Sequence, residues 1–301
     1  MLPPSPAGRF APSPSGDLHI GNLRTAVLAW LFAHATGRGF AIRMEDLDRV
    51  RPGSDVRQLR DLAALGLSWD EPVVYQSQRL EEYRAVVDEL VAAGRTFECY
   101  CTRREILEAP SAPHAPQGAY PGTCRDLSEA QRAQRRSERP AAIRLRAEVS
   151  SFTVHDLLYG EFTGDVDDFV LVRNDGTPAY NLAVVVDDAA TGVDQVVRGD
   201  DLLSSAPRQA FLATLLGHRP PEYAHVPMVL NRSGARLAKR DGAVTLTDLA
   251  GHGVDAASAL SMMAESLGLA AAGEPVTLNV LAERFDPSTL VRTPWVFVPP
   301  E

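Results

Sequence analysis

The sequence contains fewer basic than acidic residues. Its 301 residues contain 30 Lys and Arg against 39 Asp and Glu, a net charge of −9 at pH 7. No overall positive field favours nucleic acid, so any contact with RNA must be local. The richest basic stretch, residues 132–146, could face a phosphate backbone but is more typical of a solvated charged helix.

The sequence also lacks a signal peptide and a membrane span. The N-terminus has no basic region followed by an apolar run. Residues 25–35 form the most apolar helical stretch, which is about half as long as a membrane span. We therefore expect a cytoplasmic protein without membrane contacts.

Cysteine is rare and confined to one segment, at Cys99, Cys101 and Cys124. An odd number of clustered cysteines argues against the disulfide framework of a small secreted domain. Thiolates suit tetrahedral zinc, and a metal site here would need a fourth ligand, for which His114 is chemically the commoner candidate. Three free buried cysteines are the alternative.

The order of the predicted elements indicates an α/β fold on a parallel sheet. A strand, a turn, a helix and a second strand follow one another near the N-terminus, the unit from which parallel sheets are built. These elements are expected at residues 8–12, 13–21, 22–36 and 40–44. The others are helices at 79–93 and 205–216, strands at 141–146, 168–172, 193–198 and 223–230, an irregular loop at 109–122 and a mostly helical region at 246–269.

A candidate phosphate site lies at the first turn, where residues 9–22 read Arg-Phe-Ala-Pro-Ser-Pro-Ser-Gly-Asp-Leu-His-Ile-Gly-Asn. A strand-to-helix turn binds phosphate through free backbone N–H groups and the positive end of the helix. Gly21 lets the backbone approach closely, and His19 can donate a ring N–H to a phosphate oxygen. A lone His-x-Gly also occurs in many ordinary turns.

A second basic segment, Arg236-Leu237-Ala238-Lys239-Arg240, follows a tight turn at residues 231–234. Its cations could close over a triphosphate from the side opposite the first turn. Neither segment alone identifies a nucleotide site, but the two together favour one.

Together the segments resemble the two signatures of class I aminoacyl-tRNA synthetases, in the form found in the glutamyl branch. Residues 9–21 match the pattern Arg-Phe-Ala-Pro-Ser-Pro-Ser-Gly-x-Leu-His-x-Gly, and residues 236–240 occupy the place of Lys-Met-Ser-Lys-Ser. Asn22 stands where many members have a second histidine, and Ala238 lacks a hydroxyl. Asparagine can still donate to a phosphate and Arg236 keeps a charge, so we interpret the site as active but modified.

The resemblance implies a site for glutamate and for ATP with Mg²⁺. Glutamate brings one ammonium group and two carboxylates, which one carboxylate and two arginines complement. The implied glutamate-binding residues are Arg9, Ala11 and Ser13 in the pocket, Glu45 on the ammonium group, and Tyr180 and Arg198. The implied ATP-binding residues are His19, Gly21, Asn22, Arg236 and Lys239, of which His19, Asn22 and Lys239 are the catalytic ones. Without the family pattern, Glu45 would be a solvated acid, and Arg198 would pair with Asp200 or Asp201.

The implied fold is a Rossmann-like doubly wound parallel sheet with an insertion. The resemblance covers residues 9 to about 249. We expect the first half of the catalytic domain at 1–95, an acceptor-binding insertion at 96–185, the second half at 186–245 and a small helical subdomain at 246–301. Short members of the glutamyl branch bind structural zinc in this insertion, which implies the ligands Cys99, Cys101, Tyr120 and Cys124, with Tyr120 in place of His114.

The sequence ends soon after the second signature, where longer members continue with a helical region that reads the anticodon. The resemblance therefore implies a short member that activates L-glutamate with ATP without tRNA and attaches it to the queuosine base of tRNA(Asp). The alternatives are a truncated synthetase that charges tRNA(Glu), a small-molecule nucleotidylyltransferase and a tRNA-binding module without activity. We expect a monomer.

Overall fold

The centre of the molecule is a mostly parallel sheet. The structure is a computed structural model that describes residues 6–108, 120–237, 242 and 244–300. These residues form a seven-stranded sheet in which β6 and β7 pair antiparallel and the other neighbours run parallel. In spatial order the strands are β3 (Asp70–Tyr75), β2 (Gly39–Met44), β1 (Ala7–Phe10), β9 (Val193–Gly199), β10 (Glu222–Val226), β6 (Ser151–Asp156) and β7 (Gly160–Asp165).

The strand order reverses between β1 and β9, which pair although they lie far apart in the sequence. From β1 the chain adds β2 and β3 on one side, whereas β10 follows on the far side of β9. Such a reversal opens a crevice at the carboxyl ends of the two central strands, where open α/β sheets bind their ligands. The segment 9–22 begins in β1 and continues past this edge.

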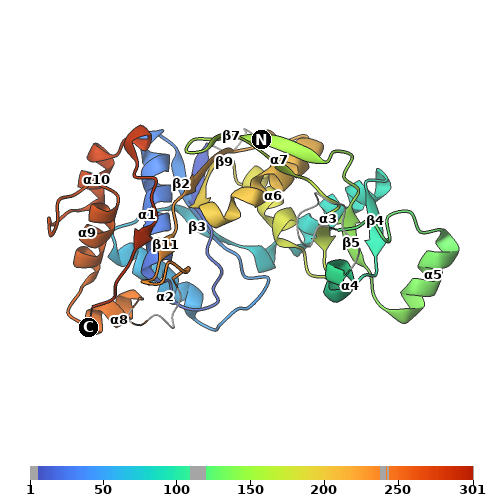
Figure 1. The fold of residues 1–301 in the computed structure, drawn as a ribbon, viewed down its shortest axis with the longest axis horizontal. Helices are drawn as coiled ribbons and strands as arrows, with labels where there is room; N and C mark the ends of the chain where they lie inside the picture. The colour runs from blue at the N-terminus through green and yellow to red at the C-terminus, as the bar shows by residue number, and fades with distance from the viewer. Residues whose placement is uncertain (1–5, 109–119, 238–241, 243, 301) are drawn as a thin grey trace.

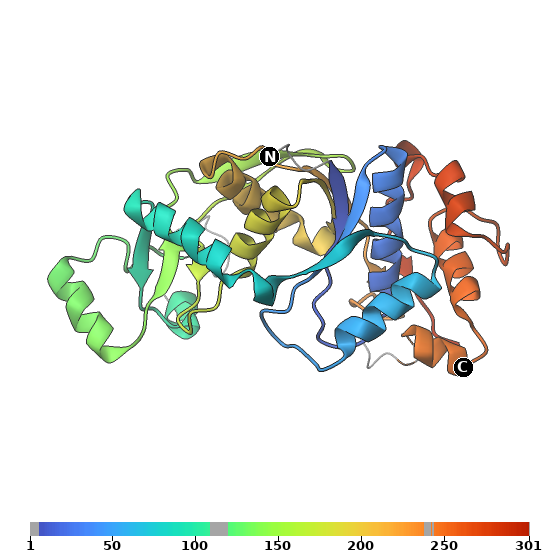
Figure 2. The same cartoon turned by 180° about the vertical axis from the view of Figure 1, so that it is seen from behind.

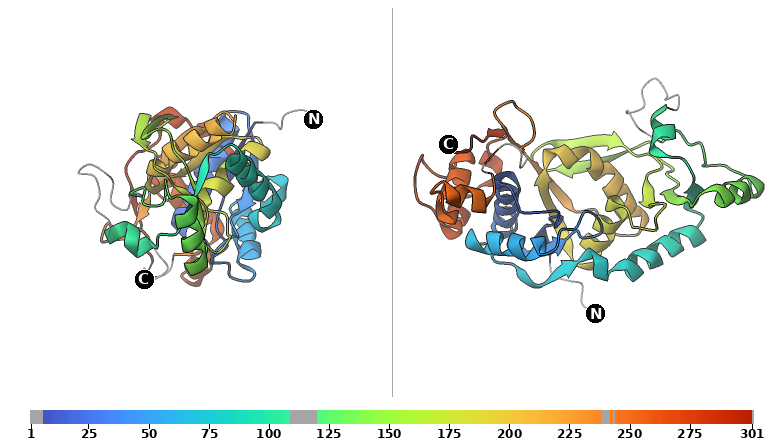
Figure 3. Two further views of the ribbon diagram at one scale, coloured as in Figure 1. Left: turned by 90° about the vertical axis from the view of Figure 1, so that its right-hand side faces the viewer. Right: turned by 90° about the horizontal axis from the view of Figure 1, so that it is seen from below.

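Helix α1 (Ile20–Ala35) is held on several sides because nearly all of its surface is apolar. It packs against β1, β2 and β9 and also contacts α9 (Ala256–Ser266) and α10 (Leu278–Arg284). Figure 3 shows it between the sheet and these helices. Its start at the crevice is thereby fixed. Among the described helices, α1 included, none is both long and apolar enough to cross a membrane.

Helices α6 (Tyr180–Ala190) and α7 (Ala206–Leu215) pack together and cover the other face of the sheet. Neighbouring strand residues point to opposite faces. Val197 of β9 accordingly joins the core around α1, and Val196 joins the core that contains Ala206 and Ala210 of α7. The sheet is therefore buried on both faces, as parallel sheets are.

A small antiparallel sheet lies at the end of the molecule opposite α9 and α10 (Figures 1 and 2). It contains β4 (Thr96–Cys99), β5 (Ala142–Leu145) and β8 (Val170–Val172). Helix α3 (Leu80–Ala92) leads to this sheet, and α4 (Arg103–Glu108) and α5 (Glu129–Glu138) lie beside it. The small sheet belongs to the predicted insertion, 96–185, and is separate from the central sheet. Strands β6 and β7 also fall in that range, but they extend the central sheet.

Helix α5 carries much of the basic stretch noted in the sequence, and none of its residues is buried. Arg132 pairs with Glu129 at 2.8 Å, and Arg136 pairs with Glu129 at 2.8 Å and with Glu98 at 2.7 Å. Nearby acids thus balance these arginines, which is typical of a solvated charged helix.

Two predicted elements are divided in the structure. The predicted strand 223–230 is β10 followed by β11 (Val229–Leu230), because Pro227 has no N–H for a ladder and β11 pairs instead with β12 (Trp295–Val296). The predicted helical region 246–269 is α8 (Leu246–Gly251) and α9, separated at Gly253, whose φ of 79° is left-handed and ends helices. The sequence analysis predicted neither α2 (Ser54–Ala64) nor β3, α6 and the β6–β7 hairpin. The loop predicted at 109–122 lies mostly outside the described residues.

Candidate active site

A cleft of about 570 Å³ lies at the carboxyl ends of β1 and β9. It is lined by ten residues that the sequence singled out, from five separate stretches of the chain. They are Arg9, Ala11, Ser13, His19, Gly21, Asn22, Glu45, Tyr180, Arg198 and Arg236. Lys239 and Ala238 lie outside the described residues. The first segment and Arg236 of the second therefore line the same cavity.

His19 and Asn22 bond to each other across the first turn of α1. His19 is the N-cap, with extended φ of −85° and ψ of 163°, and its Nδ1 accepts from the backbone N–H of Asn22 at 3.2 Å. The backbone N–H of His19 donates to Asn22 Oδ1 at 3.3 Å. This reciprocal capping box satisfies two N–H groups of the turn. A neutral ring that accepts at Nδ1 carries its proton on Nε2.

Gly21 is required by close packing at the same turn. A Cβ at this position would lie 3.0 Å from His19 Nδ1 and 3.1 Å from the Cβ of Val229. A side chain here would push either the imidazole or β11 away. Gly21 therefore keeps the wall of the cleft closely packed around the His19 ring.

The flank that follows the second basic segment is attached to the first turn. The N–H of Ile20 donates to the carbonyl of Val244 at 2.7 Å, and His19 forms an isolated β-bridge with Thr245. Thr245 in turn caps α8 in a capping box with Asp248. Val244 and Thr245, which follow the second segment, thus lie beside His19 of the first.

The start of the second segment is attached on the other side of the cleft. Arg236 Nη1 lies 2.7 Å from Asp201 Oδ2, although the arginine side chain is 66% exposed. Asp201 therefore pairs with Arg236, whereas the sequence had offered it as an alternative partner of Arg198. Both flanks of residues 238–243 are tied at the cleft.

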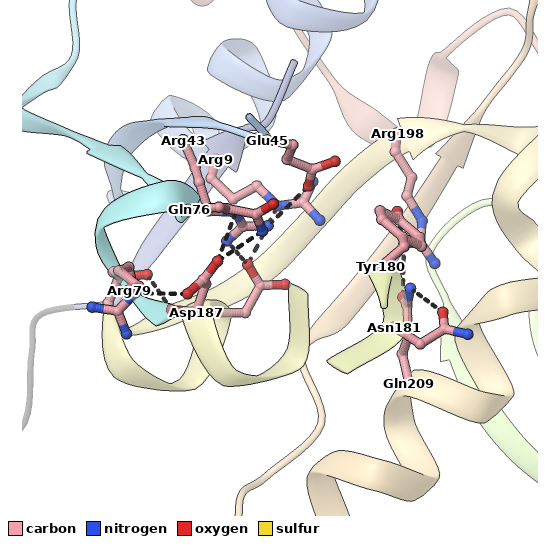
Figure 4. Close-up of polar contacts among 12 residues, drawn as sticks. Arg9, Arg43, Glu45, Gln76, Arg79, Tyr180, Asn181, Asp187, Arg198 and Gln209 are labelled. Atoms are coloured by element: carbon pink, nitrogen blue, oxygen red, sulfur yellow. Dashed lines mark hydrogen bonds and ion pairs between the residues drawn. The ribbon is translucent and has the colours of Figure 1, made fainter. Parts of the chain in front are cut away.

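Glu45 belongs to a buried cluster of charges (Figure 4). Arg43 Nη2 donates to Glu45 Oε1 at 3.5 Å, and Arg43 Nη1 donates to Asp188, which also accepts from Arg9 Nε at 3.5 Å. Burial works against the charge of Asp188, but Arg43 and Arg9 lower its pKa. Burial also raises the pKa of Glu45, and here the same two arginines offset the shift only in part. Glu45 is the acid of this cluster that an added cation would stabilise.

A second carboxylate on α6 connects this cluster to α3. Asp187 is fully buried and pairs with Arg43 at 3.6 Å. It accepts hydrogen bonds from Gln76 Nε2 at 2.8 Å, from Arg79 Nε at 2.7 Å and from the Tyr83 hydroxyl at 2.9 Å. The position of the Arg43 guanidinium therefore depends on two helices.

Arg198 lies on the other side of the cleft and bonds only to uncharged groups among the described residues. Its Nε donates to His225 Nε2 at 3.0 Å, and its Nη1 donates to Gln209 Oε1 at 2.7 Å and to the Tyr180 hydroxyl at 3.3 Å. Nη2 donates to the carbonyl of Leu202 at 3.4 Å. Figure 4 shows Arg198 beside Tyr180 and near Gln209. The charge of the guanidinium thus stays available to a ligand.

Several residues that shape the cleft were not found in the sequence. Arg43 and Asp188 hold the first cluster, and His225 and Gln209 hold Arg198. The available signal was charge in an apolar setting: Arg43 lies within the apolar strand β2, and Asp188 ends the apolar stretch of α6. A charge so placed must have a buried partner.

The three cysteines converge away from the cleft. The sulfur atoms of Cys99, Cys101 and Cys124 lie within 4.8 Å of one another. The hydroxyl of Tyr120 accepts from the N–H of Cys124 at 2.7 Å, and the Arg144 guanidinium lies 3.9 Å from the Tyr120 ring centroid. Three thiols beside a phenol suit a tetrahedral zinc ion. His114 lies outside the described residues.

Comparison with protein families places the fold in a known class. A sequence model described as "tRNA synthetases class I (E and Q), catalytic domain" matches residues 7–299. The chain belongs to this family, and its fold is the class I synthetase catalytic fold.

Individual relatives are more specific. A glutamyl-Q tRNA(Asp) synthetase of Nocardia farcinica is 64% identical over 291 residues, which cover 96% of this chain and 92% of the relative. A protein of the same name from Cutibacterium acnes is 54% identical over 274 residues, which cover 89% and 78%. The crystal structure of glutamate-tRNA synthetase from Elizabethkingia anophelis matches with a TM-score of 0.82 and 26% identity, over 98% of this chain and 68% of that one.

Proposed function

We propose that this protein activates L-glutamate with ATP, without tRNA, and transfers the glutamyl group to the queuosine base in the anticodon of tRNA(Asp). The observation that carries the proposal is one cleft that is lined by the first segment, by Arg236 of the second and by residues suited to glutamate. The relatives at 64% and 54% identity support the acceptor, since tRNA(Asp) is part of their name. The protein is thus a ligase of the aminoacyl-tRNA synthetase type.

Glutamate would present its ammonium group to Glu45 and its carboxylates to Arg9 and Arg198. Burial raises the pKa of Glu45, so a bound ammonium group would supply missing charge compensation. Arg198 has only uncharged partners among the described residues, so a substrate carboxylate would be its counterion. Ala11 and Ser13 line the cleft beside Arg9 and would complete the pocket.

The first step would join glutamate to AMP. A carboxylate oxygen attacks the α-phosphorus of ATP in line, and pyrophosphate leaves together with Mg²⁺. His19 Nε2–H and the N-terminus of α1 would stabilise charge on the phosphates, with Arg236 and Lys239 acting from the second segment. The backbone N–H of Asn22 would hold the His19 ring, and the Asn22 side chain would hold the His19 backbone. Positioning and electrostatics suffice here, because the resulting mixed anhydride is itself the activated species.

The second step would move the glutamyl group to RNA. A hydroxyl of queuosine attacks the carbonyl carbon of the adenylate, AMP leaves with the bonding electrons, and the hydroxyl proton passes to the departing phosphate. This step needs no protein nucleophile. The protein's part would be to hold the anticodon loop against the open side of the cleft.

We also propose that Cys99, Cys101, Tyr120 and Cys124 hold one structural zinc ion. Bound there, zinc would balance the thiolates and lock the segment around β4. None of the four lines the cleft. Chelation should therefore lower the thermal stability of the protein while tRNA-independent glutamate activation persists, and Tyr120→Phe should lower zinc content measured by elemental analysis. Full zinc retention in Cys124→Ser would contradict this assignment.

The acceptor is tested by transfer of labelled glutamate to three purified RNAs, in the presence of ATP. These are tRNA(Asp) with queuosine, tRNA(Asp) without it, and tRNA(Glu). Label on the first alone is the expected result, and label on tRNA(Glu) would instead identify a synthetase that charges its 3′ end. No label on any RNA would contradict the transfer step.

Activation is measured separately, as glutamate-dependent exchange of pyrophosphate into ATP in the absence of tRNA. Lys239→Ala is the matched variant, and it should depress exchange far more than glutamate binding. Equal rates of pyrophosphate exchange in the wild type and in Lys239→Ala would show that Lys239 takes no part in activation.

A further inference from the structure

Behind Arg198 lies a buried histidine–aspartate pair that neither signature segment includes. His225 is in β10, Asp156 ends β6, and both side chains are 0% exposed. His225 Nε2 accepts from Arg198 Nε at 3.0 Å, and His225 Nδ1 lies 2.6 Å from Asp156 Oδ2. Neither residue lines the cleft, so any action on a ligand must pass through Arg198.

These contacts define the tautomer of His225. Arginine Nε always carries a hydrogen, so His225 Nε2 must offer its lone pair. The ring proton is then on Nδ1, where it is donated to Asp156. Burial, and to a lesser degree the charge of Arg198, lower the pKa of His225, so the ring is neutral near pH 7.

Asp156 is built to remain a carboxylate. Its Oδ1 accepts from the backbone N–H groups of Leu158 at 2.9 Å and Tyr159 at 3.0 Å, and its Oδ2 accepts from the N–H of His225 at 3.1 Å. Burial opposes the charge, but these donors and the His225 ring lower the pKa of Asp156. The carboxylate is thus anchored by backbone before it meets the imidazole.

We propose that Asp156 and His225 are positioning residues that orient the Arg198 guanidinium toward the carboxylate of the amino acid. The bond to Nε sets the plane of the guanidinium, and its Nη1 then reaches Gln209 and Tyr180. The reverse tautomer would place two donors, Nε2–H and Nε–H, against each other and displace the arginine. This inference rests on the proposed function, in which Arg198 binds glutamate.

Three variants separate orientation from packing. His225→Gln keeps an acceptor for Arg198 and a donor for Asp156, whereas His225→Leu keeps neither. Asp156→Asn keeps the shape but offers an amide N–H, which favours the reverse tautomer. We expect KM for glutamate to rise roughly tenfold in His225→Leu and Asp156→Asn and to stay within about threefold of wild type in His225→Gln.

A merely structural role would not change KM for glutamate while leaving KM for ATP unchanged. KM for ATP should stay within about twofold in all three variants, because Arg198 lies on the amino-acid side. The matched control is His155→Gln, which changes an exposed histidine next to Asp156 on β6 and should behave as wild type. Parallel rises in both KM values, or a His225→Gln variant as impaired as His225→Leu, would overturn the proposal.

The tautomer can be read without any activity, which separates this inference from the proposed function. Nitrogen-15 spectra should show His225 with its proton on Nδ1 at pH 7 and with it on Nε2 in Asp156→Asn, the signal being assigned by its loss in His225→Gln. An imidazolium or an Nε2–H ring in the wild type would overturn the inference. The expected tautomer in a protein that activates no glutamate would support the arrangement and contradict the proposed function.

Discussion

The two sides of the cleft hold their arginines by different means. On one side Arg9 and Arg43 contact the buried carboxylate of Asp188. On the other, Arg198 is held by the neutral acceptors His225 and Gln209. One side is a buried cluster of paired charges, and the other is a charge presented to the cavity.

This difference separates stability from binding. A buried cluster of paired charges is costly to break, because the partner left behind is an unpaired buried charge. An arginine held by neutral groups leaves no such charge behind when it is removed, but a ligand carboxylate loses its counterion. The same substitution on the two sides should therefore have different consequences.

The largest effect on folding is expected for Arg43→Met. This change removes the cation that Asp187 and Asp188 share and leaves them only Arg79 and Arg9, so we expect a loss of about 3 kcal/mol in the free energy of unfolding. Urea denaturation measures it. The exposed pair Arg284–Glu274 supplies the control, since Arg284→Met should have little effect. Equal losses in both variants would show that burial of the cluster contributes nothing.

Arg198→Met tests the other side with the same substitution. We expect kcat/KM for glutamate to fall by about 100-fold in pyrophosphate exchange, because a charge-assisted pair in a cleft contributes on the order of 2–3 kcal/mol. The free energy of unfolding should fall by less than in Arg43→Met. If Arg198→Met destabilised the protein more than Arg43→Met and left KM for glutamate unchanged, the two sides would not differ as inferred.

The features that could be predicted from the sequence are the local ones. The place of the first turn could be predicted because residues 9–22 are contiguous, although α1 begins at Ile20 rather than at residue 22 and its cap, His19, was not predicted. The parallel sheet followed from the alternation of strands and helices near the N-terminus. Both rest on short-range order, which a sequence displays directly.

The partners of the site residues could not be predicted because they are long-range. Arg9 and Asp188 are 179 residues apart, and His225 and Asp156 are 69 apart. Their meeting depends on β9 inserting beside β1 and on β6 pairing with β10. No local pattern encodes those pairings, although a charge within an apolar strand or helix indicates that some partner exists.

The smallest effect concerns the pH dependence of stability at Glu45. Burial raises the pKa of this carboxyl, with Arg43 and Arg9 opposing and Asp188 reinforcing the shift. The folded protein then binds the proton more tightly than the unfolded chain, so this contribution to stability is complete at acid pH and is lost as pH rises through the folded pKa. Glu45→Gln has no carboxyl group to ionise, so it does not lose this stability as pH rises. Its melting temperature should therefore exceed that of the wild type by about 2 °C at pH 8, with a smaller difference at pH 5.

Asp188→Asn is the matched control for Glu45→Gln, because the pKa of Asp188 is lowered and the sign reverses. Its charged form stabilises the fold above the ordinary aspartate pKa, so Asp188→Asn should be less stable than the wild type by a constant amount from pH 5 to pH 8. Glu45→Gln should at the same time lose glutamate activation, since the ammonium group loses its partner. A Glu45→Gln variant that is destabilised at pH 8 would mean that Arg43 already balances Glu45 fully, and the cluster would then have no charge left for the substrate.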